Sequence, residues 1–176
     1  MPSDWIQTYT GQRFRPLEPE PSAIRIEDIA HSLSLLCRFN GHCRVFYSVA
    51  EHSVRVSHAV PPETALVGLL HDAAEAYLSD LPRPFKRWLP AFEEAEDHLL
   101  QVILEHFDEP WPLPDEVLRA DDVLLATEMR DLMGEPPAPW GLRQEPLDEH
   151  IVALRSAEAK QAFIERFEAL REIRGR

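Results

Sequence analysis

The adjacent residues His71 and Asp72 are the first candidates for chemistry. They directly follow the apolar pair Leu69-Leu70 and precede two alanines. An unpaired carboxylate on an apolar face costs several kcal/mol or shifts its pKa until it is neutral. Glu75 lies three residues after Asp72 and therefore shares its helical face. The pattern predicts either a bound cation or a buried hydrogen-bond network between the histidine and the carboxylates.

His52 is the second candidate. Ser48 and Glu51 have the spacing of a capping box, which predicts that a helix begins after Ser48 and runs to about Ala59. One inward stripe then forms at Val49, His52, Val56 and Ala59. A histidine on an apolar face is more often a hydrogen-bonded core residue than a ligand, so both roles stay open for His52.

The acidic pair Asp121-Asp122 completes the set, among Leu118, Leu124 and Leu125. One of the two should point inward, but helical periodicity accepts either. Two imidazoles and two carboxylates form a mixed N/O site that suits Mn, Fe, Co, Zn or Mg. With four protein ligands, an octahedral ion keeps positions for water and a phosphate oxygen. Such an ion can activate the water and polarise a phosphoryl group.

The elements that must position these residues are helices. Apolar periodicity predicts helices over residues 27–38, 48–59, 65–77, 89–107 and 115–133, and one or two more up to residue 171. Prolines predict loops over 79–84 and 136–139. Residues 1–22 are expected to form an extended arm that packs through Trp5, Ile6, Tyr9 and Phe14. We predict an all-α fold, a single domain over 1–176 with about six or seven helices, ending in a helical segment over 147–176.

Composition limits the partners. The formal net charge is −13, and an acidic surface repels DNA and RNA. Only Cys37 and Cys43 are present, in neither a metal-knuckle nor a redox spacing. The N-terminus lacks a signal-peptide pattern, and no apolar run approaches the roughly 20 residues of a membrane span, so a cytoplasmic protein is expected. The acidic residues Glu93, Glu94, Glu96 and Asp97 are predicted to form a solvated helix face.

Four segments in this order resemble the HD-domain phosphohydrolase superfamily, and look closest to its compact bacterial and phage branch that includes 5'-deoxyribonucleotidases. The segments are Val49-Ala50-Glu51-His52-Ser53, Leu70-His71-Asp72-Ala73-Ala74-Glu75, Asp80-Leu81-Pro82-Arg83-Pro84-Phe85-Lys86 and Ala120-Asp121. The resemblance extends over about residues 24–132. It implies a single helical HD domain and one divalent metal ion, of which Mn, Co, Mg, Fe and Zn are the candidates. The implied ligands are His52, His71, Asp72 and Asp121, which selects Asp121 over its neighbour.

The resemblance also implies roles for acidic and basic residues near the metal. The residues that match Glu75 and Asp80 lie beside the phosphate in related enzymes, where they position water or protonate the leaving oxygen. Lys86 matches a basic residue near the phosphate. From the sequence alone, Asp80 could equally be a turn residue, and Lys86 could equally be solvent-exposed.

The pair Arg38-Phe39 is similar to an Arg-Trp pair that contacts the phosphate and crowds the sugar 2' position. Phenylalanine replaces tryptophan here, and the spacing to His52 is one residue shorter, so the sugar preference stays open. Arg38 could instead cap a helix, and Phe39 could belong to the core. His42 lies in the adjoining loop, where it is either a phosphate contact or a surface histidine.

The favoured function is hydrolysis of the 5'-phosphomonoester of a deoxynucleoside monophosphate, with a small phosphorylated substrate and no nucleic-acid polymer or membrane as partner. One alternative is a triphosphohydrolase or pyrophosphohydrolase that acts on deoxynucleoside triphosphates. Another is a catalytically inactive HD-domain ligand sensor. A homodimer is compatible with the apolar residues after Leu147.

Overall fold

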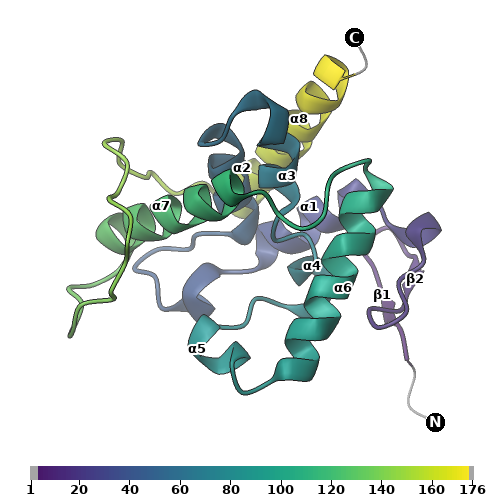
Figure 1. Ribbon diagram of the computed structural model, residues 1–176, viewed down its shortest axis with the longest axis horizontal. Coiled ribbons are helices and arrows are strands. Elements are labelled where there is room, and N and C mark those ends of the chain that lie inside the picture. Colours follow the sequence, from purple (N-terminus) through teal and green to yellow (C-terminus); the bar gives the residue numbers. More distant parts are fainter. Residues whose placement is uncertain (1–3, 175–176) are drawn as a thin grey trace.

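The structure, a computed structural model, describes residues 4–174 and confirms the all-α prediction (Figure 1). Residues 1–3 of the expected arm and 175–176 of the expected C-terminal segment lie outside the described range. The α-helices are α1 (Ile26–Leu35), α2 (Val49–His58), α3 (Ala65–Leu70), α4 (Glu75–Leu78), α5 (Arg83–Lys86), α6 (Pro90–His106), α7 (Asp115–Leu132) and α8 (Ser156–Arg174). Short 3-10 turns occupy Pro21–Ala23, Arg38–Gly41 and Pro62–Thr64.

The core lies where α1, α2, α3 and α8 pack against one another, and α7 crosses α2 at its edge (Figure 1). Fully buried aliphatic and aromatic side chains fill this region. They include Ile29, Leu33, Val56, Leu66, Leu69, Ile103 and Phe163. Burying such side chains is the main favourable term in folding, and the packing holds α2 and α3, which flank the candidate site, in fixed relative positions.

The N-terminal arm is a hairpin rather than an extended segment. Strands β1 (Ile6–Gln7) and β2 (Arg13–Phe14) pair antiparallel. Phe14 is fully buried and stacks on Tyr77, with ring centroids 4.0 Å apart. Of the other three expected anchors, Trp5 and Ile6 are 38% and 39% exposed. Tyr9 keeps 59% of its surface exposed, but its ring stacks on His31 of α1, with ring centroids 3.8 Å apart. Phe14 and Tyr9 therefore anchor the hairpin, and the amide of Thr10 adds a 2.6 Å hydrogen bond to Asp28.

Three predicted helix boundaries are wrong, and two of the differences have a local cause. The first helix ends at Leu35 instead of Arg38, because Cys37 pairs with Ser48 as an isolated β-bridge. The helix predicted over 65–77 is interrupted at 71–74. There, Nδ1 of His71 donates to the carbonyl of Gly68, which the amide of Asp72 would use in a regular helix. The C-terminal segment becomes helical only at Ser156.

Two smaller expectations also change. Ala59 is exposed because it is the C-cap residue of α2, so it leaves the inward stripe. The loop predicted over 79–84 ends early, since α5 begins at Arg83. Among residues 4–174, no helix is both long and apolar enough to cross a membrane.

The start of α2 confirms the predicted N-cap. The amide of Glu51 donates to Oγ of Ser48 at 3.1 Å. The reciprocal half of the capping box is replaced, because the Glu51 carboxylate accepts from Arg55 and from the amide of Leu154 instead. The cap fixes where α2 begins and thereby which way His52 points.

We expect Ser48→Ala to lower the free energy of unfolding by about 1 to 2 kcal/mol, because a buried amide loses its partner. Chemical denaturation of the wild type and the variant measures the difference. Ser22→Ala is the matched control, since Ser22 is exposed in the Pro21–Ala23 turn, and it should change stability little. Equal stability of the wild type and Ser48→Ala would show that the cap does not stabilise α2.

Candidate metal centre and its cavity

The four predicted metal ligands come together from three places in the fold. His52 lies on α2, His71 and Asp72 lie in the turn between α3 and α4, and Asp121 lies on α7. Nε2 of His52 is 3.2 Å from Nε2 of His71 and 3.1 Å from Oδ1 of Asp121. Nε2 of His71 is 3.3 Å from Oδ2 of Asp72. The Asp121 side chain is 15% exposed and that of Asp122 is 43% exposed, so Asp121 is the inward member of the pair.

Hydrogen bonds on the far side of each imidazole fix where the ring protons lie. Nδ1 of His71 is 2.8 Å from the carbonyl oxygen of Gly68, which can only accept. Nδ1 of His52 is 2.6 Å from the carboxylate of Glu128. In the neutral tautomers both Nδ1 atoms carry the proton, and both Nε2 lone pairs point at the same small volume as the carboxylates of Asp72 and Asp121.

Such a convergence of acceptors is repulsive unless a positive charge lies among them. His52, His71 and Asp72 each offer a ligand atom, and these atoms lie within 4.8 Å of one another. Two neighbouring ligands of an ion with bonds of about 2.1 Å stand about 3 Å apart, close to the observed spacings. The mixed imidazole and carboxylate set fits a divalent ion of borderline hardness. Binding itself stays a prediction.

The pKa values of His52 and Asp121 are shifted in the directions that favour positive charge at the site. Burial and the nearby Arg38 would lower the pKa of His52, but the carboxylates of Glu128 and Asp121 outweigh them and raise it to about 9. Burial would raise the pKa of Asp121, yet its contact with His52 holds it well below its usual range. A proton on His52 therefore offsets the negative charge of Glu128 and Asp121, as a bound cation would.

Glu128 on α7 connects the candidate metal centre to Arg38, and the sequence analysis missed it. It is fully buried, and its Oε1 accepts from His52 while its Oε2 accepts from Nε of Arg38 at 3.1 Å. Burial would raise the pKa of Glu128, but Arg38 and His52 lower it. A signal existed in the sequence, because Glu128 follows Asp121 by seven residues, two helical turns along one face.

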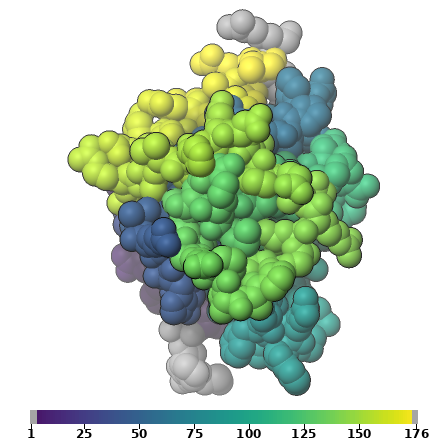
Figure 2. Space-filling view, turned by 90° about the vertical axis from the view of Figure 1, so that its left-hand side faces the viewer, coloured from purple at the N-terminus to yellow at the C-terminus, as the bar shows by residue number. Residues whose placement is uncertain are grey.

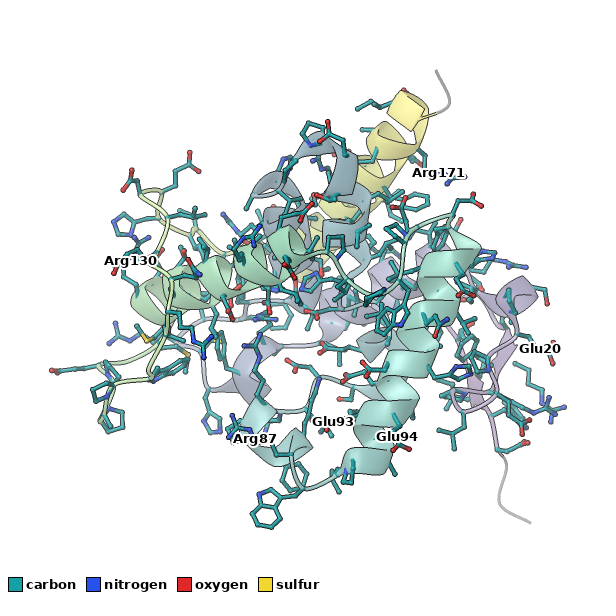
Figure 3. The ribbon with its side chains drawn as sticks, in the orientation of Figure 1. Glu20, Arg87, Glu93, Glu94, Arg130 and Arg171 are labelled. Carbon is teal, nitrogen blue, oxygen red and sulfur yellow. The ribbon has the colours of Figure 1, made fainter. Side chains whose placement is uncertain are left out.

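A cavity of about 850 Å³ opens beside these groups. That volume is in the range of sites for small organic ligands. Five of the chain's 18 lysines and arginines line it, although the whole chain is acidic. They are Arg38, Arg83, Lys86, Arg87 and Arg143. Figure 3 shows Arg87 beside α5. Five acidic residues line the same cavity, so the basic side chains can pair with an anionic ligand although the wall has no excess of positive groups.

The acidic residues Glu75 and Asp80 also line this cavity. Glu75 is almost fully buried, and its Oε2 has no hydrogen-bond partner among the described residues. Burial, then Asp72 and Asp80, raise the pKa of Glu75 well above its usual value. Burial also raises the pKa of Asp80, with Asp72 adding to the effect and Arg38 opposing it. Both carboxyl groups are thus suited to hold a proton beside an anionic ligand.

Lys86 reaches the cavity wall and is not simply solvent-exposed. Its Nζ is 3.6 Å from Oε1 of Glu75 and 2.8 Å from Oε1 of Glu96 on α6. Burial would lower the pKa of Lys86, but its hydrogen bond to Glu96 raises it. The acidic face predicted for α6 is therefore partly wrong. Glu93, Glu94 and Asp97 are exposed, whereas Glu96 turns inward to hold Lys86.

The loop after α1 carries three further candidates, of which two line the cavity and one does not. Arg38 and Phe39 line the cavity, and Arg38 lies over the Phe39 ring at 5.4 Å. His42 is exposed and is not part of the cavity wall, because the turn of Arg38–Gly41 directs it outward. Arg83 had no assigned role, yet it donates to Asp121 and, at 3.3 Å, to Asp122.

Fold and site together define an all-α protein with a candidate metal centre beside a cavity lined by five basic and five acidic side chains. No protein-family model matches the chain. It is 40% identical over 173 residues to the uncharacterized protein YfdR of Escherichia coli (strain K12), with 97% of both chains aligned. The chain therefore belongs to the same family as YfdR.

Two further relatives match over part of the chain. An uncharacterized protein of Rhodobacter capsulatus is 36% identical in an alignment of 126 residues, and the match covers 66% of this chain and 64% of the relative. A 5'-deoxynucleotidase of Photobacterium profundum is 30% identical in an alignment of 111 residues, and the match covers 48% of this chain and 57% of that enzyme.

Glu128→Gln tests whether Glu128 orients the candidate ligand His52. We expect the affinity for Mn²⁺ or Zn²⁺ to fall by about 10- to 100-fold, because the second nitrogen of a ligating imidazole needs a strong acceptor. Calorimetric titration of chelator-stripped protein measures it without any substrate. Glu116→Gln makes the same change near the start of α7, away from the cavity. Unchanged affinity in Glu128→Gln would contradict the orienting role.

Proposed function

We propose that the chain is an HD-domain, metal-dependent phosphohydrolase that removes the 5'-phosphate of deoxynucleoside monophosphates. The observation that carries the proposal is that ligand atoms of His52, His71 and Asp72 lie within 4.8 Å of one another, with Asp121 3.1 Å from His52, beside a cavity that five basic side chains line. The partial similarity to a 5'-deoxynucleotidase supports the reaction and the substrate class. Intact ligands with Glu75 and Asp80 beside them favour an enzyme over an inactive sensor.

In the proposed reaction the ligand set would hold the metal ion, and basic side chains of the cavity would bind the phosphate. A divalent ion bound there would polarise a phosphate oxygen and lower the pKa of a water molecule. Arg38 donates through Nε to Glu128 at 3.1 Å and through Nη1 to Asp72 at 3.5 Å. It also lines the cavity, where its guanidinium can contact a phosphate. A fixed guanidinium next to the phosphoryl group stabilises the charge that develops there. Lys86, which donates to Glu96, adds a second positive charge to the cavity wall.

The departing 5'-oxygen needs a proton, and Glu75 or Asp80 would supply it. Both side chains line the cavity and both have raised pKa values. A carboxyl group that keeps its proton near neutral pH can act as a general acid. Glu75 has the stronger claim, because it is more deeply buried and one of its oxygens has no hydrogen-bond partner within residues 4–174.

Asp72→Ala tests the metal centre. We expect loss of bound metal and a fall of at least about 100-fold in phosphate release, because an ion deprived of a carboxylate binds weakly and stabilises charge poorly. Stripped protein is reloaded with Mn, Co, Mg, Fe or Zn singly and assayed with each NMP, dNMP and dNTP. Asp97→Ala is the control, since Asp97 is exposed on α6 and lies outside the cavity wall.

The products of that assay separate the alternatives. Orthophosphate from deoxynucleoside monophosphates supports the proposal. Tripolyphosphate or pyrophosphate from deoxynucleoside triphosphates would reassign the chain as a triphosphohydrolase or pyrophosphohydrolase. Full activity in Asp72→Ala would refute the metal site, and no turnover by metal-loaded wild type would favour a sensor.

Glu75→Gln and Asp80→Asn identify the proton donor through the leaving group. We expect loss of the true donor to lower kcat on a deoxynucleoside monophosphate by about 100-fold or more. The same variant should lose less than about 10-fold on p-nitrophenyl phosphate, because p-nitrophenolate departs without a proton. Equal losses on both substrates would mean that the residue positions the phosphate or the water instead.

A further inference from the structure

The long connection between α7 and α8 returns to the cavity. In Figure 1 it runs along the end of α7, and Figure 2 shows green and yellow-green atoms of α7 and the following segment spread over one face of the molecule. Four consecutive residues of this connection line the cavity: Trp140, Gly141, Leu142 and Arg143. None of them belongs to the candidate metal centre, so they can contact a part of the ligand other than its phosphate.

Trp140 and Phe39 form an aromatic corner in the cavity wall. Their ring centroids are 6.0 Å apart, with planes inclined by 58°. Trp140 keeps 39% of its surface exposed, and Phe39 is partly buried. Two aromatic faces at such an angle allow a flat ring to stack on one and meet the edge of the other.

The backbone of Phe39 supports a ligand-binding role for the corner. Phe39 has φ +55° and Asn40 has φ +52°. A bulky side chain rarely adopts this left-handed conformation. Strain of this kind is typical of ligand-binding sites. Here it brings the Phe39 ring to the cavity beside Trp140.

We propose that Trp140 forms, with Phe39, a stacking subsite for the nucleobase of the substrate; this rests on the proposed function for the phosphate end. The cavity volume of about 850 Å³ exceeds what a phosphate group alone requires. Every nucleobase has a flat π face, so stacking tolerates all bases while selecting against phosphate esters that have none. Trp140 is thereby a specificity-determining residue for a base-bearing substrate.

The kinetic test compares a deoxynucleoside 5'-monophosphate with 2-deoxyribose 5-phosphate, which keeps the sugar and phosphate but lacks the base. Trp140→Leu should raise KM for the nucleotide by about 5- to 100-fold, the range of one base stack, and leave KM for the sugar phosphate unchanged. Trp88→Leu is the matched control, because Trp88 is 81% exposed and outside the cavity wall. Equal KM changes on both substrates, or none on the nucleotide, would overturn the subsite.

A second readout does not depend on turnover. Titration with deoxyadenosine, which has no phosphate to hydrolyse, should quench the tryptophan fluorescence of the wild type and of Trp88→Leu but not of Trp140→Leu. Circular dichroism first establishes that Trp140→Leu is folded. If the wild type shows no turnover but this quenching pattern holds, the proposed hydrolysis fails while the subsite stands. If turnover is found and deoxyadenosine quenches Trp140→Leu as strongly as the wild type, or quenches neither, the subsite fails alone.

Discussion

The buried carboxylate of Glu128 is the interaction on which the arrangement of the site depends. It accepts from His52 on one oxygen and from Arg38 on the other. A fully buried charge is tolerated only where it is paired and hydrogen-bonded. Glu128 therefore requires His52 and Arg38 as partners, and it fixes the orientation of both side chains. One carboxylate thereby sets the tautomer of a candidate ligand and the plane of a candidate phosphate-binding guanidinium. A single residue of α7 thus positions both the candidate metal ligand His52 and the candidate phosphate-binding residue Arg38.

Some residues of the site lie within regular helices and others lie where a helix is interrupted, and this difference explains what the sequence could and could not predict. The cap at Ser48 fixed the phase of α2, so the inward position of His52 was predictable. The turn at His71-Asp72 was not, because it depends on a side-chain hydrogen bond that competes with the helix. The choice between Asp121 and Asp122 required family resemblance, since positions i+3 and i+4 both fit one helical face.

Residues whose roles depend on distant partners escaped prediction. The sequence predicted Glu96 to lie on a solvated face, but in the structure it accepts a hydrogen bond from Lys86 of α5. Trp140 lies in an irregular, proline-containing connection, where no periodicity indicates which way a side chain points. His42 shows the converse error, because closeness in sequence to Arg38 and Phe39 did not bring it into the cavity. The fold class followed from local patterns, whereas these positions were set by tertiary packing.

The charges of the cavity argue for its ligand more specifically than the overall charge does. The chain carries −13 formally, yet the cavity wall holds five basic side chains and five acidic ones: Asp72, Glu75, Asp80, Asp121 and Asp122. These balance when all are ionised, and a proton retained by Glu75 tips the balance to positive. A divalent ion held by the acceptors would make the cavity strongly positive inside an acidic protein. A phosphomonoester carries a charge between about −1.5 and −2 at neutral pH, so such a cavity would attract its phosphate.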